Sequence, residues 1–203
     1  MKFISALLIL IWSLSAIAED KYPALLVYGD SISAGYGMSK EKQWSEVLKS
    51  LFNKENININ IFNTSVSGET TSGGLARIDR ILDELQPSYI LIELGGNDAL
   101  RGYPPKKIFS NLNKMIEASK KRNIKVFLMQ IKILPNYGKR YQSEFESIYS
   151  ETANQTGVTL IPFMLDEIAL KRELMLNDGI HPNEEAQPLI AKFIFDSLKS
   201  YLQ

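Results

Sequence analysis

The sequence predicts a three-layer α/β/α domain built on a parallel β-sheet of five strands. Five short apolar runs alternate with longer segments whose apolar residues recur at helical spacing. Two of these runs, residues 89–92 and 126–129, are almost wholly apolar, which is typical of strands buried on both faces of a parallel sheet. Because strand and helix alternate without a break, we expect helices on both faces of the sheet.

The chain has 203 residues, which is enough for one well-packed domain and short for two. The expected strands span residues 24–28, 57–62, 89–94, 124–130 and 158–161. The expected helices span residues 44–52, 75–85, 106–122, 139–155 and 184–202. Pro87 ends the second of these helices, because proline cannot continue a helix. No internal repeat or linker divides the chain, so we expect a single domain over residues 19–203.

The composition excludes several classes of function. The formal net charge is 0 and no dense cluster of Lys and Arg occurs, so nothing indicates binding to nucleic acid. The absence of cysteine excludes disulfides, a cysteine nucleophile, thiolate metal sites and a lipidated N-terminal cysteine. A single histidine argues against a catalytic zinc site, while an all-carboxylate magnesium site stays open.

The N-terminus has the pattern of a secretory signal peptide over residues 1–18. A positive start at Lys2 is followed by an apolar stretch over residues 3–14, and Ala16-Ile17-Ala18 gives a small-x-small cleavage site. The alternatives are a buried first helix or an uncleaved anchor. Because a spanning helix needs about 20 mostly apolar residues, we favour cleavage after Ala18. We therefore expect a soluble domain that is exported to the periplasm and is not inserted in the membrane.

Polar and glycine-rich segments follow four of the expected strands. In parallel α/β sheets, ligands bind beyond the carboxyl ends of the strands, so these segments are expected to meet at one edge. They are Gly29-Asp30-Ser31, residues 63–69, Gly95-Gly96-Asn97-Asp98 and residues 178–181.

Ser31, His181 and Asp178 form a candidate catalytic triad. Imidazole is the usual base for activating a serine hydroxyl near neutral pH, and His181 is the only histidine in the chain. Asp178 lies three residues before it, close enough in a turn to orient the imidazole. The alternatives are a surface or core histidine and a serine that only caps a helix.

Two further groups could donate hydrogen bonds to an oxyanion: the backbone N–H of Gly68 and the side-chain amide of Asn97. The alternative for the Gly-Gly-Asn-Asp segment is an ordinary turn at a strand end. The chain lacks the G-x-S-x-G nucleophile elbow, the G-x-x-x-x-G-K-[ST] phosphate loop and the G-x-G-x-x-G dinucleotide fingerprint.

These motifs resemble the four blocks of the SGNH, or GDSL, hydrolases. The shared residues are Gly29-Asp30-Ser31, Gly68, Gly96-Asn97-Asp98 and Asp178-x-x-His181. Longer matches at residues 93–102, 129–131, 136–138 and 178–183 resemble the periplasmic subfamily of multifunctional acyl-CoA thioesterases, lysophospholipases and arylesterases. Two positions depart from that pattern: Glu69, where aspartate is common, and Ile133-Leu134-Pro135, where the prolines are arranged differently.

The resemblance implies Ser31 as nucleophile, His181 as base and Asp178 as its orienting partner. It implies an oxyanion hole made by the backbone N–H groups of Ser31 and Gly68 with the Asn97 side chain. It also implies a flavodoxin-like sheet of order 2-1-3-4-5, no metal and no organic cofactor. The expected activity is hydrolysis of acyl esters and thioesters, including lysophospholipids, by a monomer. A carbohydrate O-deacetylase and a non-catalytic binding module on the same fold are the alternatives.

Two segments are expected to wall an acyl groove, residues 99–105 and 131–137, since both mix apolar residues with glycine or proline beyond a strand end. The alternative is that they are ordinary surface loops. The candidate substrate contacts are Leu100, Arg101, Tyr103, Ile133, Leu134 and Tyr137.

Overall fold

The computed structural model describes residues 22–133 and 135–202. Its centre is a parallel sheet of five strands in the order β2-β1-β3-β4-β5. The strands are β1 (Ala24–Gly29), β2 (Asn60–Asn63), β3 (Tyr89–Glu93), β4 (Lys125–Met129) and β5 (Thr159–Ile161). The predicted fold class and the strand order 2-1-3-4-5 are confirmed. The expected signal peptide lies outside the described residues.

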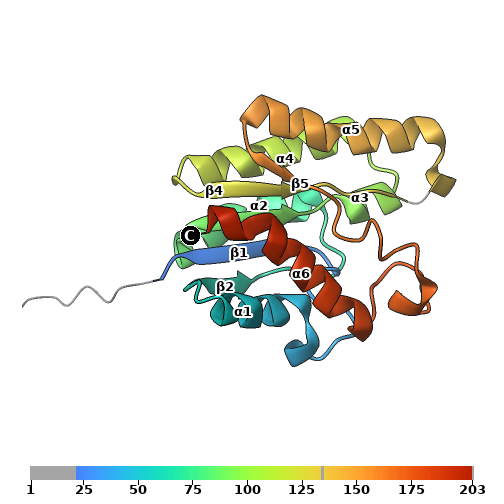
Figure 1. Cartoon of the computed structure of the whole chain (residues 1–203). Coiled ribbons are helices and arrows are strands. Elements are labelled where there is room, and N and C mark those ends of the chain that lie inside the picture. The colour runs from blue at the N-terminus through green and yellow to red at the C-terminus, as the bar shows by residue number, and fades with distance from the viewer. Residues whose placement is uncertain (1–21, 134, 203) are drawn as a thin grey trace, which may run out of the picture.

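Helices cover both faces of the sheet (Figure 1). Helices α1 and α6 pack together on one face, while α4 lies between α2 and α5 on the other. The helices are α1 (Trp44–Lys54), α2 (Thr71–Leu85), α3 (Gly96–Leu100), α4 (Pro105–Lys120), α5 (Lys139–Thr156) and α6 (Gln187–Leu198).

The central strands form the core because their side chains are apolar on both faces. All six residues of β1 are buried, as are the last four residues of β3 and of β4. The edge strand β2 is only half-buried throughout, and it has polar residues at both ends. Burial on both faces explains why β1, β3 and β4 read as continuous apolar runs in the sequence.

Some element boundaries differ from the sequence-based prediction. The second strand begins at Asn60, because the residues before it close helix α1. Asn56 there adopts a left-handed conformation, and the N–H of Ile57 donates to the carbonyl of Phe52. The last expected helix is divided, with short 3₁₀ turns before and after α6.

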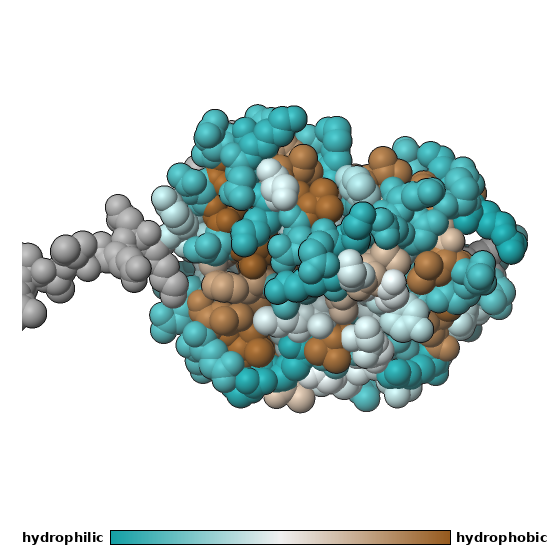
Figure 2. Space-filling model, turned by 90° about the horizontal axis from the view of Figure 1, so that it is seen from below, coloured by the Kyte–Doolittle hydropathy of each residue, from teal (hydrophilic) through white to brown (hydrophobic). Residues whose placement is uncertain are grey.

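The face formed by α1 and α6 is mostly hydrophilic, and its apolar side chains gather in separate patches between polar ones (Figure 2). Among residues 22–133 and 135–202, no helix combines the length and the apolar character needed to cross a bilayer.

Candidate active site

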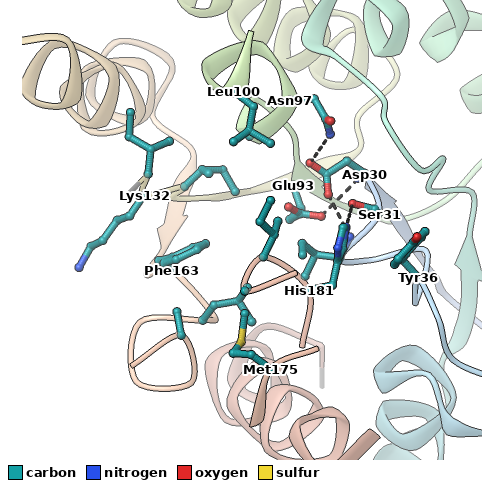
Figure 3. Close-up of a pocket in the computed structure, with 18 of the residues that line it drawn as sticks. Asp30, Ser31, Tyr36, Glu93, Asn97, Leu100, Lys132, Phe163, Met175 and His181 are labelled. Atoms are coloured by element: carbon teal, nitrogen blue, oxygen red, sulfur yellow. Dashed lines mark hydrogen bonds between the residues drawn. The ribbon is translucent and has the colours of Figure 1, made fainter. Parts of the chain in front are cut away.

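The structure brings Ser31, His181 and Asp178 together at the carboxyl edge of the sheet. Figure 3 shows Ser31 beside His181. Ser31 lies two residues beyond the end of β1, and its Oγ is 2.8 Å from Nε2 of His181. The other ring nitrogen of His181, Nδ1, lies 2.7 Å from Oδ2 of Asp178. A hydroxyl, an imidazole and a carboxylate in this order form the arrangement that activates a serine for nucleophilic attack.

A tight turn positions the histidine. Oδ1 of Asp178 accepts from the N–H groups of Ile180 (2.9 Å) and His181 (3.0 Å), while its Oδ2 meets the imidazole. Gly179 takes a φ of +67°, which glycine adopts at little steric cost. The carbonyl of His181 accepts from the N–H of Leu176 at 2.7 Å and anchors the turn. One carboxylate therefore shapes the turn and orients the ring.

Asp178 remains an anion at neutral pH. Desolvation acts to raise the pKa of Asp178, but hydrogen bonds from the backbone of His181 and Ile180 and from the imidazole outweigh it. These bonds lower the pKa to about 2. A carboxylate that stays ionised can stabilise an imidazolium on its neighbour throughout the neutral range.

Three groups near Ser31 could donate to an oxyanion. Within the described chain, no protein acceptor is hydrogen-bonded to the backbone N–H of Ser31 or of Gly68, so both are available to a ligand. Gly68 has a φ of +79° and lines the cavity beside Ser31. The amide nitrogen of Asn97, in α3, donates one hydrogen bond to Oδ2 of Asp30 at 3.0 Å, which leaves its second N–H free of that contact.

A buried network fixes the short helix that presents Asn97. The next residue, Asp98, is fully buried and accepts 2.7 Å hydrogen bonds from both the N–H and the hydroxyl of Thr71 in α2. Asn111 of α4 donates to the same hydroxyl at 3.0 Å. Helix α3 is therefore tied to two neighbouring helices, and the Asn97 amide is fixed before substrate binds.

Two buried acids, Asp30 and Glu93, lie close to Ser31. Oε2 of Glu93 accepts from the hydroxyl of Ser33 at 2.7 Å and from the N–H of Asp30 at 3.3 Å. Burial raises the pKa of Asp30 to about 6, against hydrogen bonds from Ile32 N–H and Asn97 that lower it. Burial and the nearby Asp30 carboxylate raise the pKa of Glu93 well above its usual range. Burial thus disfavours the charged form of both acids, and an ionised Asp30 further disfavours a charge on Glu93.

A cavity of about 520 Å³ opens beside these groups. Ser31, Gly68, Asn97 and His181 line one part of it. The apolar part is lined by Leu100, Ile131, Ile133, Phe163, Leu165, Leu170 and Met175. Lys132 and Asp166 also line it and form an ion pair of 2.6 Å. The cavity thus joins a polar end, which holds Ser31 and His181, to an apolar part, and its size suits a small organic ligand.

Comparison with known proteins identifies the family. The model of the GDSL-like Lipase/Acylhydrolase family matches residues 27–188, which is most of the chain. The chain belongs to this family.

Curated and solved relatives cover nearly the whole chain. An arylesterase of Vibrio mimicus is 47% identical over 195 residues, covering 96% of this chain and 97% of the relative. Thioesterase 1/protease 1/lysophospholipase L1 of Escherichia coli K12 is 39% identical over 193 residues, covering 95% of this chain and 90% of the relative. The crystal structure of the esterase EstA from Pseudoalteromonas has a TM-score of 0.86 and 42% identity, covering 88% of this chain and 98% of that chain. The predicted family and the predicted ester hydrolase class are confirmed.

Not every expected substrate contact of this GDSL-like hydrolase lines the cavity. Leu100 and Ile133 do, whereas Arg101, Tyr103 and Tyr137 do not. The guanidinium of Arg101 instead donates to the carbonyl of Gly68 at 3.2 Å. Tyr103 lies beneath the ammonium of Lys107, and Tyr137 faces a separate hollow at the start of α5. Leu134 lies outside the described residues.

The sequence-based prediction missed the part of the cavity wall that follows β5. Phe163, Leu165 and Leu170 come from this irregular segment, which was not assigned a role. The available signal was its position, because the segment follows a strand at the same edge as the other motifs.

Within residues 22–133 and 135–202, no group of three or more His, Asp or Glu side chains is placed to bind a metal ion.

Proposed function

We propose that this GDSL-like hydrolase cleaves carboxylic esters and thioesters of acyl chains, with Ser31 as nucleophile, His181 as base and Asp178 as its orienting acid. The observation that carries the proposal is the 2.8 Å contact between Ser31 Oγ and His181 Nε2, with Asp178 on the opposite ring nitrogen. Ser31 is buried at the end of β1, where the rigid sheet fixes its position.

Acylation begins when the hydroxyl oxygen of Ser31 attacks the substrate carbonyl and its proton passes to Nε2 of His181. Asp178 stabilises the imidazolium that forms. The carbonyl oxygen becomes an oxyanion, and the N–H groups of Ser31 and Gly68 with the amide of Asn97 donate to it. The tetrahedral intermediate then breaks, and the imidazolium returns the proton to the departing alcohol or thiol.

Deacylation repeats the same steps with water. Nε2 of His181 takes a proton from a water molecule, which attacks the acyl carbonyl on Ser31. The oxyanion forms in the same hole, and the serine oxygen leaves as His181 gives the proton back to it. The products are the carboxylic acid and the free enzyme, and the balance requires no cofactor.

The apolar part of the cavity favours acyl substrates over acetylated carbohydrates. A carbohydrate would need polar partners for its hydroxyl groups, since burying a hydroxyl without a hydrogen bond is unfavourable by about 1–3 kcal/mol. Leu100, Ile133 and Phe163, which lead away from Ser31, offer none, and the charged groups of Lys132 and Asp166 in the same cavity are paired with each other. We therefore place the acyl chain of aryl esters, acyl thioesters and lysophospholipids along this wall.

Replacement of Ser31 or His181 by alanine tests the mechanism. Each change should lower the kcat for a p-nitrophenyl ester by about a thousandfold or more, because the triad acts as a unit. Ser39→Ala is a matched control, since it removes an exposed serine a short distance along the same loop. A fluorophosphonate probe should add one label to the wild type, detected by intact mass, and none to Ser31→Ala. Near-wild-type turnover by Ser31→Ala would refute the mechanism.

We also propose that the protein is exported and acts as a monomer in the periplasm. Support comes from the signal pattern over residues 1–18, which lie outside the described residues. The exported protein should then begin at Glu19, and intact-mass analysis of the periplasmic fraction measures this directly. Full-length protein that retains Met1 and stays in the cytosol would contradict export, and sedimentation analysis would test the monomer.

A further inference from the structure

Tyr36 packs against the imidazole of His181. The two ring centroids are 4.3 Å apart and the ring planes are tilted by 32°. Figure 3 shows Tyr36 beside His181, on the side away from Phe163 and Lys132. Tyr36 remains 51% exposed, so its ring covers the imidazole without filling the core. The mechanism above gives this contact no role.

The turn that follows the nucleophile fixes the backbone of Tyr36. Its N–H donates to the carbonyl of Ser31 itself at 3.0 Å. The neighbouring residues Gly35 and Gly37 have φ of +68° and +77°, and a Cβ at Gly35 would overlap the side chain of Gln43. One turn therefore carries both the nucleophile and the ring that contacts the base, and its two glycines permit this close arrangement.

The contact adds a restraint that the triad lacks. The hydrogen bonds of His181 act at its two ring nitrogens and in the plane of the ring. They do not by themselves prevent the imidazole from tilting about the line that joins Asp178 and Ser31. A ring packed against one face opposes that tilt, and proton transfer depends on such alignment.

The contact is also expected to strengthen during the reaction. His181 becomes a cation when it accepts the proton of Ser31, and the electron-rich face of a tyrosine attracts a cation. Because this attraction grows as charge develops, it stabilises the transition state more than the resting enzyme. An interaction of this kind raises kcat and leaves substrate binding almost unchanged.

We propose that Tyr36 is a positioning residue for His181: its ring holds the imidazole in line with Ser31 and Asp178 and stabilises the imidazolium. The proposal rests on the proposed function, in which His181 is the base. It requires the aromatic ring and does not require the hydroxyl group of Tyr36.

Kinetics with two ring variants test the role. Tyr36→Phe should keep kcat within about twofold, while Tyr36→Leu should lower kcat by roughly 5- to 30-fold with little change in KM. The loss should be equal for a p-nitrophenyl acetate and for an acetyl thioester, since His181 acts on both. Tyr22→Leu is a matched control, because Tyr22 is 53% exposed and precedes β1 at the opposite edge of the sheet.

Proton NMR provides a readout that does not depend on turnover. His181 is the only histidine, so a tag-free chain shows a single pair of imidazole C–H resonances. Tyr36→Leu should move this pair by removing the ring current, whereas Tyr36→Phe and Tyr22→Leu should leave it almost unchanged. The wild type should also show a nuclear Overhauser effect between the rings of Tyr36 and His181.

Several results would overturn the role of Tyr36. They are an unchanged kcat in Tyr36→Leu, an equal loss in Tyr36→Phe, a loss confined to aryl esters, or the absence of the Overhauser effect in the wild type. A loss confined to aryl esters would make Tyr36 a contact of the leaving group. Failure of the proposed function is separate: it would appear as an active Ser31→Ala enzyme, whatever the imidazole resonances of the Tyr36 variants show.

Discussion

At the scale of single residues, Asp30 links the proposed nucleophile, Ser31, to Asn97 and Glu93. It precedes Ser31, accepts from the Asn97 amide and lies beside the buried Glu93. The carboxylate is only 4% exposed, and burial raises its pKa to about 6. The side chain of Asn97 is therefore held by the carboxylate of Asp30, whose ionisation is disfavoured by burial.

Asp30 should make the folded protein less stable as the pH rises from about 4 to 6. The unfolded chain loses the Asp30 proton near pH 4, whereas the folded protein keeps it until about pH 6. In that window the folded state binds more protons, so the free energy of unfolding falls with rising pH by up to about 3 kcal/mol. Asp30→Asn should remove this part of the slope, measured by urea unfolding at several pH values.

The control for this measurement is Asp79→Asn, which removes an exposed carboxylate from α2. Asp30→Asn also replaces a hydrogen-bond acceptor by a donor opposite Asn97, and this alone changes the free energy of unfolding. The comparison therefore uses how steeply the free energy of unfolding changes with pH in each variant. Parallel curves for the wild type and Asp30→Asn between pH 4 and 6 would show that burial does not raise the pKa of Asp30.

At the scale of secondary-structure elements, Gly95 joins β3 to the short helix α3 that presents Asn97. Its φ of +123° is in a region that residues with a side chain rarely adopt. A Cβ at this position would overlap the hydroxyl oxygen of Tyr149, which is fully buried and donates to the carbonyl of Leu94 at 3.0 Å. Both the backbone and the packing therefore require glycine here.

Gly95→Ala should destabilise the protein by more than about 2 kcal/mol. Backbone strain contributes about 1–2 kcal/mol and the overlap with Tyr149 a further 1–3 kcal/mol. Gly157→Ala is the matched control, because Gly157 has a φ of +68° but no atom within 4 Å of an added Cβ. In urea unfolding, Gly157→Ala should lose only the part of the free energy of unfolding that comes from backbone strain. Equal losses in both variants would mean that Tyr149 moves aside freely.

The elements differ in how far the sequence predicts them. The central strands are predictable because burial on both faces leaves a continuous apolar run. Helix α3 is not, since five residues are too short to show a helical period. Its position depends on Asp98 accepting from Thr71, 27 residues away, and no local pattern reveals such a contact.

The arrangement of Ser31, His181 and Asp178 is easier to predict from the sequence than the wall of the cavity. A serine, a lone histidine and a spaced aspartate are chemically distinctive wherever they occur. The wall of the cavity is made of common apolar residues whose role depends only on where they lie in space. For this reason the sequence predicts Leu100 and Ile133, which line the cavity, together with Tyr103 and Tyr137, which do not. It does not single out Phe163, which does.

At the scale of the whole molecule, the parallel topology collects loops from all five strands at one edge. The segments after β1 and β3 supply Ser31, the proposed nucleophile, and Asn97. The segments after β3, β4 and β5 also supply Leu100, Ile133 and Phe163. An acyl chain attached to Ser31 would therefore contact residues contributed by three different loops.

This arrangement predicts a preference for longer acyl chains that depends on the wall. Each methylene buried gains up to about 0.8 kcal/mol, so kcat/KM should rise by up to about fourfold per methylene until the cavity is filled. Ile133→Ser and Leu100→Ser should each lower the ratio of octanoyl to acetyl ester hydrolysis by about tenfold. The ratio is measured with p-nitrophenyl esters of the two acids, so the leaving group stays the same.

Leu189→Ser is the matched control for the wall, because Leu189 is 48% exposed on α6 and does not line the cavity. It should leave the ratio of octanoyl to acetyl hydrolysis unchanged. If the wall variants lost activity equally on both esters, Leu100 and Ile133 would support the reaction centre and would not bind the chain. The apolar loops would then no longer distinguish an acyl ester hydrolase from a deacetylase. The two activities would have to be distinguished by the residues that contact the leaving alcohol.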